Sequence, residues 1–195
     1  SILAVDADTG EYRWHYQTTP RDRWDYTATQ QIMLADLPLG EGGASRRVVM
    51  QAPKNGFFYV LDAADGELIS ATPFTNQNWT TGEFDENGRP VLVEEAVDLA
   101  LYAVVPGPTG AHNWHPMAFN PDTGLVYIPV NEIPFFYDKT RNVEDGKSYW
   151  NIGYDAAAGW PVEYPAGTLD AVADLDGGSL LAWDPVKAEP RWAVP

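Results

Sequence analysis

The 195-residue sequence contains no cysteine. Disulfides, zinc–thiolate sites, iron–sulfur clusters and c-type haem attachment are therefore excluded within it. Basic residues are scarce, because 12 Lys and Arg stand against 28 Asp and Glu and give a formal net charge of −16. Nucleic acid and anionic membrane surfaces are bound by clustered Lys and Arg, so neither partner is expected. The sequence also lacks any apolar run near the ~18 residues of a membrane-spanning helix.

Turn-forming and aromatic residues are abundant instead, with 17 Gly, 16 Pro, 8 Trp and 10 Tyr. This composition predicts an all-β fold of short strands joined by tight turns. The 45% of apolar residues is enough to build a core. The chain starts at Ser1 in the strand-like run SILAVD and stops in another, RWAVP. We therefore expect residues 1–195 to be a piece of one larger domain, truncated at both ends.

An internal repeat organises the chain. An apolar strand, an Asp or Asn and a short polar turn recur in four places, which read LAVDADTGEYRW (3–14), VLDAADGELIS (60–70), AFNPDTGLVYI (118–128) and LAWDPVKAEPRW (181–192). The corresponding turn positions Gly10, Gly66, Gly124 and Ala188 lie 56, 58 and 64 residues apart. Self-similarity at such a period is typical of repeat architectures.

Each copy has the pattern of a β-hairpin, in which the Asp caps the turn and Gly adopts a left-handed conformation. Trp14 and Trp192 follow the turn position by four residues and are expected to lie flat against a neighbouring unit. A periodic strand module with a periodic Trp predicts a β-propeller. The alternative is a β-sandwich that carries similar hairpins by chance.

The spacing exceeds the ~40–50 residues of common propeller blades, which requires insertions. We place them at 71–111 and 129–178, as loops at one end of the scaffold, where function usually resides. The alternative is that they have no function of their own or form subunit contacts. The insertions hold the aromatic residues Trp79, Phe84, Phe135, Phe136, Trp150 and Trp160.

The first hairpin resembles the tryptophan-docking motif of the pyrroloquinoline quinone (PQQ)-dependent alcohol dehydrogenases, and the likeness runs through the whole chain. Its most specific strings are WDYTATQ, APKNGFFYVLD and HNWHPMAFNP. The resemblance implies an eight-bladed propeller with PQQ and calcium at its axis, of which this segment would form about half. Within this family, the sequence most resembles the alcohol dehydrogenase branch, which includes quinohaemoproteins, because the basic residue of APKNG is a Lys.

Asp25 is the predicted catalytic residue. Trp24 and Tyr26 flank it, and such neighbours can desolvate a carboxylate and tune it as a base. From the residues alone, a turn or ladder role is the more common reading of a Trp-Asp pair. The resemblance implies that Asp25 takes the hydroxyl proton while hydride passes to PQQ, and that it lies near the metal.

Lys54 is a predicted cofactor-binding residue. A Lys before Asn-Gly is usually the exposed end of a hairpin turn. The resemblance implies instead that its ammonium bonds the quinone oxygens. A positive charge there would stabilise negative charge that develops on the quinone, and would hold Asp25 ionised.

Asn113 and Trp114 are the other predicted cofactor contacts, also by resemblance, although blade packing is an alternative for Trp114. Asn offers both donors and an acceptor to a polar quinone edge. His112 and His115 have a spacing that invites a metal site, but no third ligand lies nearby in sequence. Calcium prefers oxygen donors in any case.

The family's remaining site residues fall outside the matched stretch. The resemblance places a Glu and an Asn that bind calcium, and a pair of adjacent cysteines, before it; a haem c domain, where present, follows it. Only Asp25 would contribute to the metal site here. The metal, calcium or a lanthanide, and the presence of haem are therefore left open.

The resemblance thus implies a periplasmic oxidoreductase that converts a small alcohol to an aldehyde and passes electrons to a cytochrome c or a quinone. We expect the segment alone to be inactive. Two alternatives remain: a non-enzymatic propeller that binds other proteins, and a glucose or polyol dehydrogenase with the same cofactor. Convergence of Asp25, Lys54 and Asn113 would favour an enzyme over a scaffold.

Overall fold

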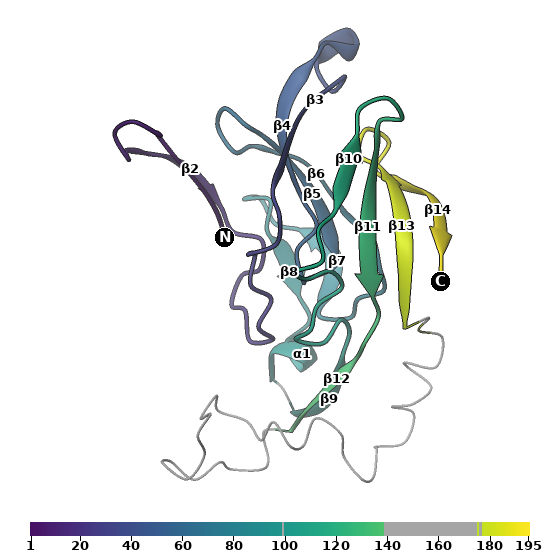
Figure 1. Ribbon diagram of the computed structural model, residues 1–195. Helices are drawn as coiled ribbons and strands as arrows, with labels where there is room; N and C mark the ends of the chain where they lie inside the picture. Colours follow the sequence, from purple (N-terminus) through teal and green to yellow (C-terminus); the bar gives the residue numbers. More distant parts are fainter. Residues whose placement is uncertain (99, 139–174, 176) are drawn as a thin grey trace.

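The computed structural model describes residues 1–98, 100–138, 175 and 177–195 (Figure 1). Antiparallel β-strands make up nearly all of its regular structure, as the composition predicted. The exceptions in the described part are a 3-10 turn, η1 (Glu41–Gly43), and a short helix, α1 (Glu94–Asp98). Among the described residues, no helix combines the length and apolar character that crossing a membrane requires.

Two four-stranded antiparallel sheets form the body of the segment. The first contains β3 (Met33–Leu37), β4 (Arg46–Gln51), β5 (Phe57–Asp62) and β6 (Leu68–Pro73). The second contains β10 (Ala118–Asn120), β11 (Leu125–Asn131), β13 (Gly178–Asp184) and β14 (Glu189–Val194). Each sheet pairs its strands in chain order, which is the topology of a propeller blade.

A two-stranded hairpin, β1 (Ile2–Val5) and β2 (Tyr12–Tyr16), precedes the two complete blades. The expected partial propeller is therefore present. Its described residues hold two four-stranded blades and this hairpin, which is fewer than the four blades of half an eight-bladed ring.

Strand β5 is buried on both faces and separates two hydrophobic clusters. Phe57, Tyr59 and Leu61 join Trp14, Trp24 and Trp79 on one side. Phe58 and Val60 face the second sheet, where Phe58 packs against Trp183 at a ring-centroid distance of 5.8 Å. Because side chains alternate along a strand, an unbroken apolar run such as FFYVL serves both clusters at once.

Trp14 docks the first hairpin onto the first complete sheet, as predicted. Its side chain is buried, and its indole Nε1 donates to the carbonyl oxygen of Ala63 at 3.1 Å. The ring lies against Gly66 so closely that a Cβ there would come within 2.5 Å of Trp14 Cε3. Gly66 is therefore required twice, for its φ of +77° and for the space that the ring occupies.

The four repeats do not each mark a separate blade. The turns at Gly10, Gly66 and Ala188 join the last two strands of their sheets, whereas Gly124 lies between β10 and β11, the first two strands of the second sheet. The third and fourth repeats thus belong to one blade. Trp192 packs its ring on Tyr127 of its own sheet and is 43% exposed, and its expected docking against a neighbouring unit stays a prediction.

The described parts of the insertions form structure of their own, of which α1 and the strand pair after it lie at the lower end of Figure 1. The first contains β7 (Thr80–Phe84), β8 (Pro90–Leu92), α1 and β9 (Ala100–Val104). Strand β9 pairs with β12 (Phe135–Asp138), which belongs to the second insertion. Trp79 is fully buried and packs against Trp24 and Tyr26, whereas Trp150 and Trp160 lie outside the described residues.

We expect Gly66→Ala to destabilise the protein more than Gly10→Ala does. Both glycines have a similar positive φ, +77° and +73°, but an added Cβ at Gly10 meets no atom within 4 Å. The difference between the variants therefore isolates the clash with Trp14, for which overpacking predicts about 1–3 kcal/mol. Urea titration of the full-length protein measures it, and equal losses would contradict the docking contact.

Trp14→Ala is expected to lower the free energy of unfolding by about 3–5 kcal/mol, the typical cost of truncating a buried Trp. Trp14→Phe is the control, because it keeps a smaller aromatic ring against Gly66 while it removes the hydrogen bond to Ala63 O. Thermal unfolding of the full-length protein, followed by tryptophan fluorescence, compares the two variants. A loss in Trp14→Phe as large as that in Trp14→Ala would show that packing of the ring does not account for the effect.

Candidate active site

The loop between β2 and β3 carries Asp25 between two buried aromatic residues. Trp24 is fully buried, and its Nε1 donates to the carbonyl oxygen of Ala96 in α1 at 3.2 Å. Tyr26 is 1% exposed and donates its hydroxyl to the carbonyl oxygen of Pro106. Burial raises the pKa of Tyr26 well above its usual range, so this hydroxyl keeps the proton that it donates. Both neighbours thus anchor the loop.

Asp25 itself has a left-handed backbone, with φ of +64°. This conformation is uncommon outside glycine, although Asp tolerates it better than most residues. Its side chain is 65% exposed, in contrast to both neighbours. Backbone conformations of this kind cluster at functional sites, where the surrounding structure enforces them.

Lys54 contacts Asp25 directly. It lies in the turn between β4 and β5 and is only 7% exposed. Its Nζ donates to the Asp25 carbonyl oxygen at 2.9 Å and lies 3.3 Å from the carboxylate oxygen Oδ2. Two residues predicted separately from sequence, 29 positions apart, are therefore brought together. One ammonium holds both the backbone and the side chain of Asp25.

Asn55 ties the Lys54 turn to the loop that leads to Asp25. It is completely buried, and its Nδ2 lies within hydrogen-bond distance of Thr18 O, Thr19 Oγ1 and the Tyr59 hydroxyl. The Tyr59 hydroxyl also donates to Thr18 O at 2.9 Å. This network fixes the turn relative to the start of the loop.

A third segment packs on Lys54 from the other side. A Cβ at Gly110 would fall 2.3 Å from Lys54 Cγ, so only glycine fits against this side chain. The next residue, Ala111, donates its N–H to the Lys54 carbonyl oxygen at 2.9 Å. These contacts place the segment that carries Asn113 and Trp114 beside the Lys54 turn.

Asn113 and Trp114 come just after the segment that contacts Lys54. No hydrogen bond joins either of them to Lys54 or Asp25. Asn113 donates its Nδ2 to Thr109 O at 2.9 Å, while its Oδ1 is buried and has no hydrogen-bond partner in the described part of the chain. Trp114 is 86% exposed, so it does not pack within the described blades. A buried acceptor without a donor and an uncovered aromatic ring both leave groups available to a ligand.

His112 is not arranged as a metal ligand, and no group of three candidate ligands includes His112 or His115 among the described residues. His112 is fully buried, with Nδ1 2.6 Å from Ala52 O and Nε2 2.7 Å from His115 O. Both ring nitrogens therefore face backbone carbonyl oxygens, which leaves neither free to bind a metal. His112 serves to fix the segment that precedes Asn113.

These residues fit a planar, carbonyl-rich aromatic cofactor. The Lys54 ammonium has three N–H groups and directs its two observed contacts at Asp25, so a further donor remains. Asn113 offers a polar contact and Trp114 an aromatic one, in addition to this donor. A calcium site is not built by the described residues alone, because they contain no cluster of three His, Cys, Asp or Glu side chains. Asp25 is one oxygen donor of the six to eight that calcium takes.

Two supporting residues escaped the sequence analysis. Asn55 stands in the KNG turn, where Asn-Gly reads as an ordinary hairpin signal. Gly110 follows a Pro-Thr pair and likewise reads as a turn glycine. Their roles come from contacts with residues 30 or more positions away, which local patterns do not report.

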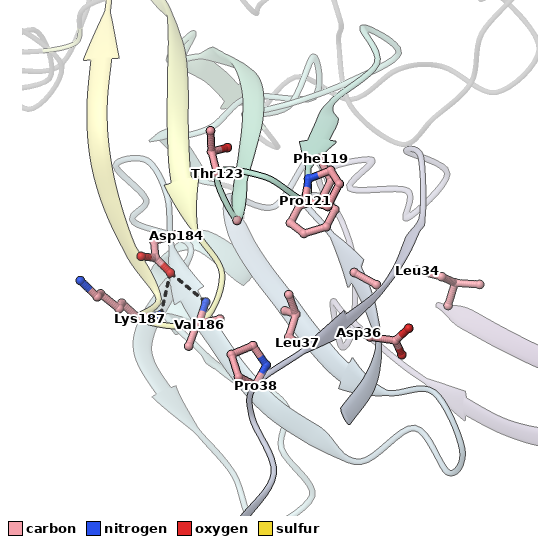
Figure 2. A pocket seen from close by; sticks show the side chains of 12 residues that line it. Leu34, Asp36, Leu37, Pro38, Phe119, Pro121, Thr123, Asp184, Val186 and Lys187 are labelled. Carbon is pink, nitrogen blue, oxygen red and sulfur yellow. Dashed lines mark hydrogen bonds between the residues drawn. The ribbon is translucent and has the colours of Figure 1, made fainter. Parts of the chain in front are cut away.

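A groove of about 640 Å³ lies at the opposite end of the sheets (Figure 2). It runs between β3 and the turns of the second sheet, with Leu37, Phe119 and Val186 among its lining residues. Since Leu37 ends β3 and Lys54 follows β4, this groove is separated from Asp25 by the length of the blade. It contains none of the predicted site residues.

Known proteins are similar to this sequence over nearly its whole length. Residues 1–77 match the family PQQ, described as the beta-propeller domain of glucose/ethanol/alcohol dehydrogenase. The chain is 49% identical to the quinohemoprotein alcohol dehydrogenase ADH-IIG of Pseudomonas putida, across 100% of the chain and 27% of that protein. It is 43% identical to the 1-butanol dehydrogenase (cytochrome c) of Thauera butanivorans, across 98% of the chain and 27% of that protein.

Solved structures of similar proteins have the same fold over the length of this chain. Quinohemoprotein alcohol dehydrogenase ADHIIG from Pseudomonas putida HK5 superposes with a TM-score of 0.81 and 44% identity, across 99% of the chain and 28% of that structure. A europium-containing methanol dehydrogenase gives a TM-score of 0.73 and 30% identity, across 98% of the chain and 32% of that structure. The chain spans about a quarter of the length of the curated relatives that it matches. Residues 1–77 therefore belong to the propeller domain of this PQQ-dependent dehydrogenase family, and the chain as a whole is similar to a part of the quinohemoprotein alcohol dehydrogenases.

Proposed function

We propose that the full-length protein oxidises an alcohol to an aldehyde with PQQ, and that Asp25 is the general base. The observation that carries this proposal is the Lys54–Asp25 contact: a buried ammonium holds an exposed carboxylate whose backbone is left-handed. The relatives' names support alcohol as the substrate class. When bound, PQQ supplies the acceptor for the hydride that leaves the alcohol carbon.

The residues of this chain supply the proton transfer and the positive charge. The Asp25 carboxylate takes the proton from the substrate hydroxyl, while the C–H electron pair leaves as hydride and a C=O bond forms. Lys54 keeps this carboxylate in place and presents its remaining N–H to the cofactor, where a fixed positive charge favours negative charge on the acceptor. Asn113 and Trp114 would hold the cofactor by a polar and an aromatic contact.

The metal, the electron acceptor and the location are features of the whole protein. We propose a divalent or trivalent cation, calcium or a lanthanide, with Asp25 as one ligand; the europium-containing neighbour supports this choice. We further propose a cytochrome c or quinone as electron acceptor, in line with the name of the butanol dehydrogenase, and a periplasmic location. Haem c would belong to a part of the protein beyond this chain.

The alternatives have less support. A protein-binding scaffold has no need for a buried Lys held against an Asp at a strand-end loop, and the Asp25–Lys54 pair is present. A glucose or polyol dehydrogenase would share the cofactor and the base. The two relatives described above are named for alcohols instead.

We expect Asp25→Asn to lower alcohol-dependent dye reduction by about 10²–10⁴-fold, the usual contribution of a general base. The assay uses the full-length protein loaded with PQQ and calcium, with bound PQQ quantified by absorbance. Asp36→Asn is the control, because Asp36 is an exposed carboxylate that also pairs with a cation, Arg47 at 3.0 Å, at the far end of the sheet. Activity near wild type in Asp25→Asn would overturn the base assignment.

Asp25→Gly is expected to be inactive yet more stable than Asp25→Ala, by about 1 kcal/mol. Both variants lose the carboxylate, but only glycine adopts φ of +64° without steric cost. The difference in urea-induced unfolding between these two variants measures the cost of placing a Cβ on the left-handed backbone at this position. Equal stabilities would show that the loop relaxes out of the left-handed conformation.

A further inference from the structure

Asp22 accepts two backbone hydrogen bonds that straddle Asp25. Its Oδ1 receives the N–H of Trp24 at 3.0 Å and the N–H of Tyr26 at 3.1 Å. The backbone therefore curls around one carboxylate oxygen, and Asp25 lies on the outside of the curl. No backbone-to-backbone hydrogen bond closes residues 22–26, so this carboxylate is what closes the loop from within.

The same arrangement recurs in the turn between β7 and β8. Asp85 Oδ1 receives the N–H of Asn87 at 2.9 Å and of Arg89 at 2.8 Å, again two and four residues further along the chain. The residue three positions on is Gly88, with φ of +68°, close to the +64° of Asp25. A carboxylate that bridges these two amides thus accompanies a left-handed third residue in both places.

The Asp25 loop differs from the turn at Gly88 in its residue type and in its backbone hydrogen bonds. Gly88 adopts the left-handed conformation without a side chain to strain it, and two backbone bonds, Asp85 N to Arg89 O and Gly88 N to Asp85 O, help to close its turn. The Asp25 loop has an Asp where that turn has a glycine and lacks such backbone bonds. Its conformation consequently depends more on the carboxylate of Asp22.

The remaining anchors fix other atoms. Trp24 and Tyr26 are held by their side chains, through Ala96 O and Pro106 O. The Tyr137 hydroxyl donates to the Trp24 carbonyl oxygen at 3.4 Å, and Lys54 holds the Asp25 carbonyl oxygen. Asp22 alone bonds the backbone amides on both sides of Asp25. Those amides set the direction in which the Asp25 side chain leaves the loop.

We propose that Asp22 is a positioning residue that sets the orientation of the Asp25 carboxylate through the Trp24 and Tyr26 amides. The inference rests on the proposed function, because it assigns to Asp22 an effect on catalysis by Asp25. Asp22 touches neither substrate nor cofactor in this role. Its contribution therefore appears in turnover and not in cofactor binding.

Asp22→Ala in the full-length, PQQ-loaded protein is expected to lower kcat about ten- to a hundredfold, as a misplacement of about 1 Å does. KM and the amount of bound PQQ should stay near wild type. Asp22→Asn retains an amide oxygen that accepts the same two bonds and is expected to restore most of kcat. Asp85→Ala, which removes the equivalent carboxylate from the matched turn, should leave kcat unchanged.

A double-mutant cycle separates positioning from a general structural role. If Asp22 acts through Asp25, adding Asp22→Ala to Asp25→Asn produces little further loss of kcat. An equal loss in both backgrounds, or an unchanged kcat in folded Asp22→Ala, overturns the inference. Should Asp22→Ala not accumulate as folded protein, Asp22→Glu keeps the charge but moves the acceptor oxygen, and an undiminished kcat in it would overturn the inference as well.

Failure of the proposed function gives a different result. In that case the Asp25→Asn variant retains turnover, and both the base role of Asp25 and the positioning role of Asp22 are wrong. If Asp25→Asn is impaired while Asp22→Ala is not, the base assignment stands and only the role of Asp22 is wrong.

Discussion

The contact between the Trp14 ring and the backbone at Gly66 joins two blades, and the candidate active site depends on that joint. From the β1–β2 hairpin the chain runs directly into the loop that carries Asp25. Lys54 instead belongs to the next blade, at the end of β5 opposite Gly66. The relative position of carboxylate and ammonium is therefore set by how two sheets pack, since no single element contains both.

The loop over these strand ends is held by polar contacts at fixed points. Asn55 secures its beginning, Asp22 its curl, and Lys54 the carbonyl oxygen of Asp25. Placement of a reactive side chain on a loop that a rigid β scaffold restrains is a common solution for enzymes. The buried cation shows how little the overall charge of −16 says about the local field at this site.

Local patterns predicted the hairpins well, because Asp caps and left-handed glycines are dictated by a few consecutive residues. They could not assign the Gly124 hairpin to the second blade's first pair of strands, since the inner and outer hairpins of a blade use the same turn chemistry. The resemblance supplied Asp25 and Lys54, and the structure shows them in contact. Gly110 was missed because its contact, Lys54, lies in a separate segment, whereas Asp22 was missed because an Asp in a loop does not by itself indicate which nearby amides it accepts from.

The pairing of β9 with β12 has a consequence for how this propeller can vary. One strand comes from each insertion, and Phe136 lies opposite Ala103 in their register. In the part of the chain that the structure describes, neither strand pairs with a blade strand, so their ladder of backbone hydrogen bonds joins one insertion to the other. The two strands are therefore structurally coupled: a change in the length or register of one alters the pairing of the other, so we expect sequence changes in one strand to be accompanied by changes in its partner.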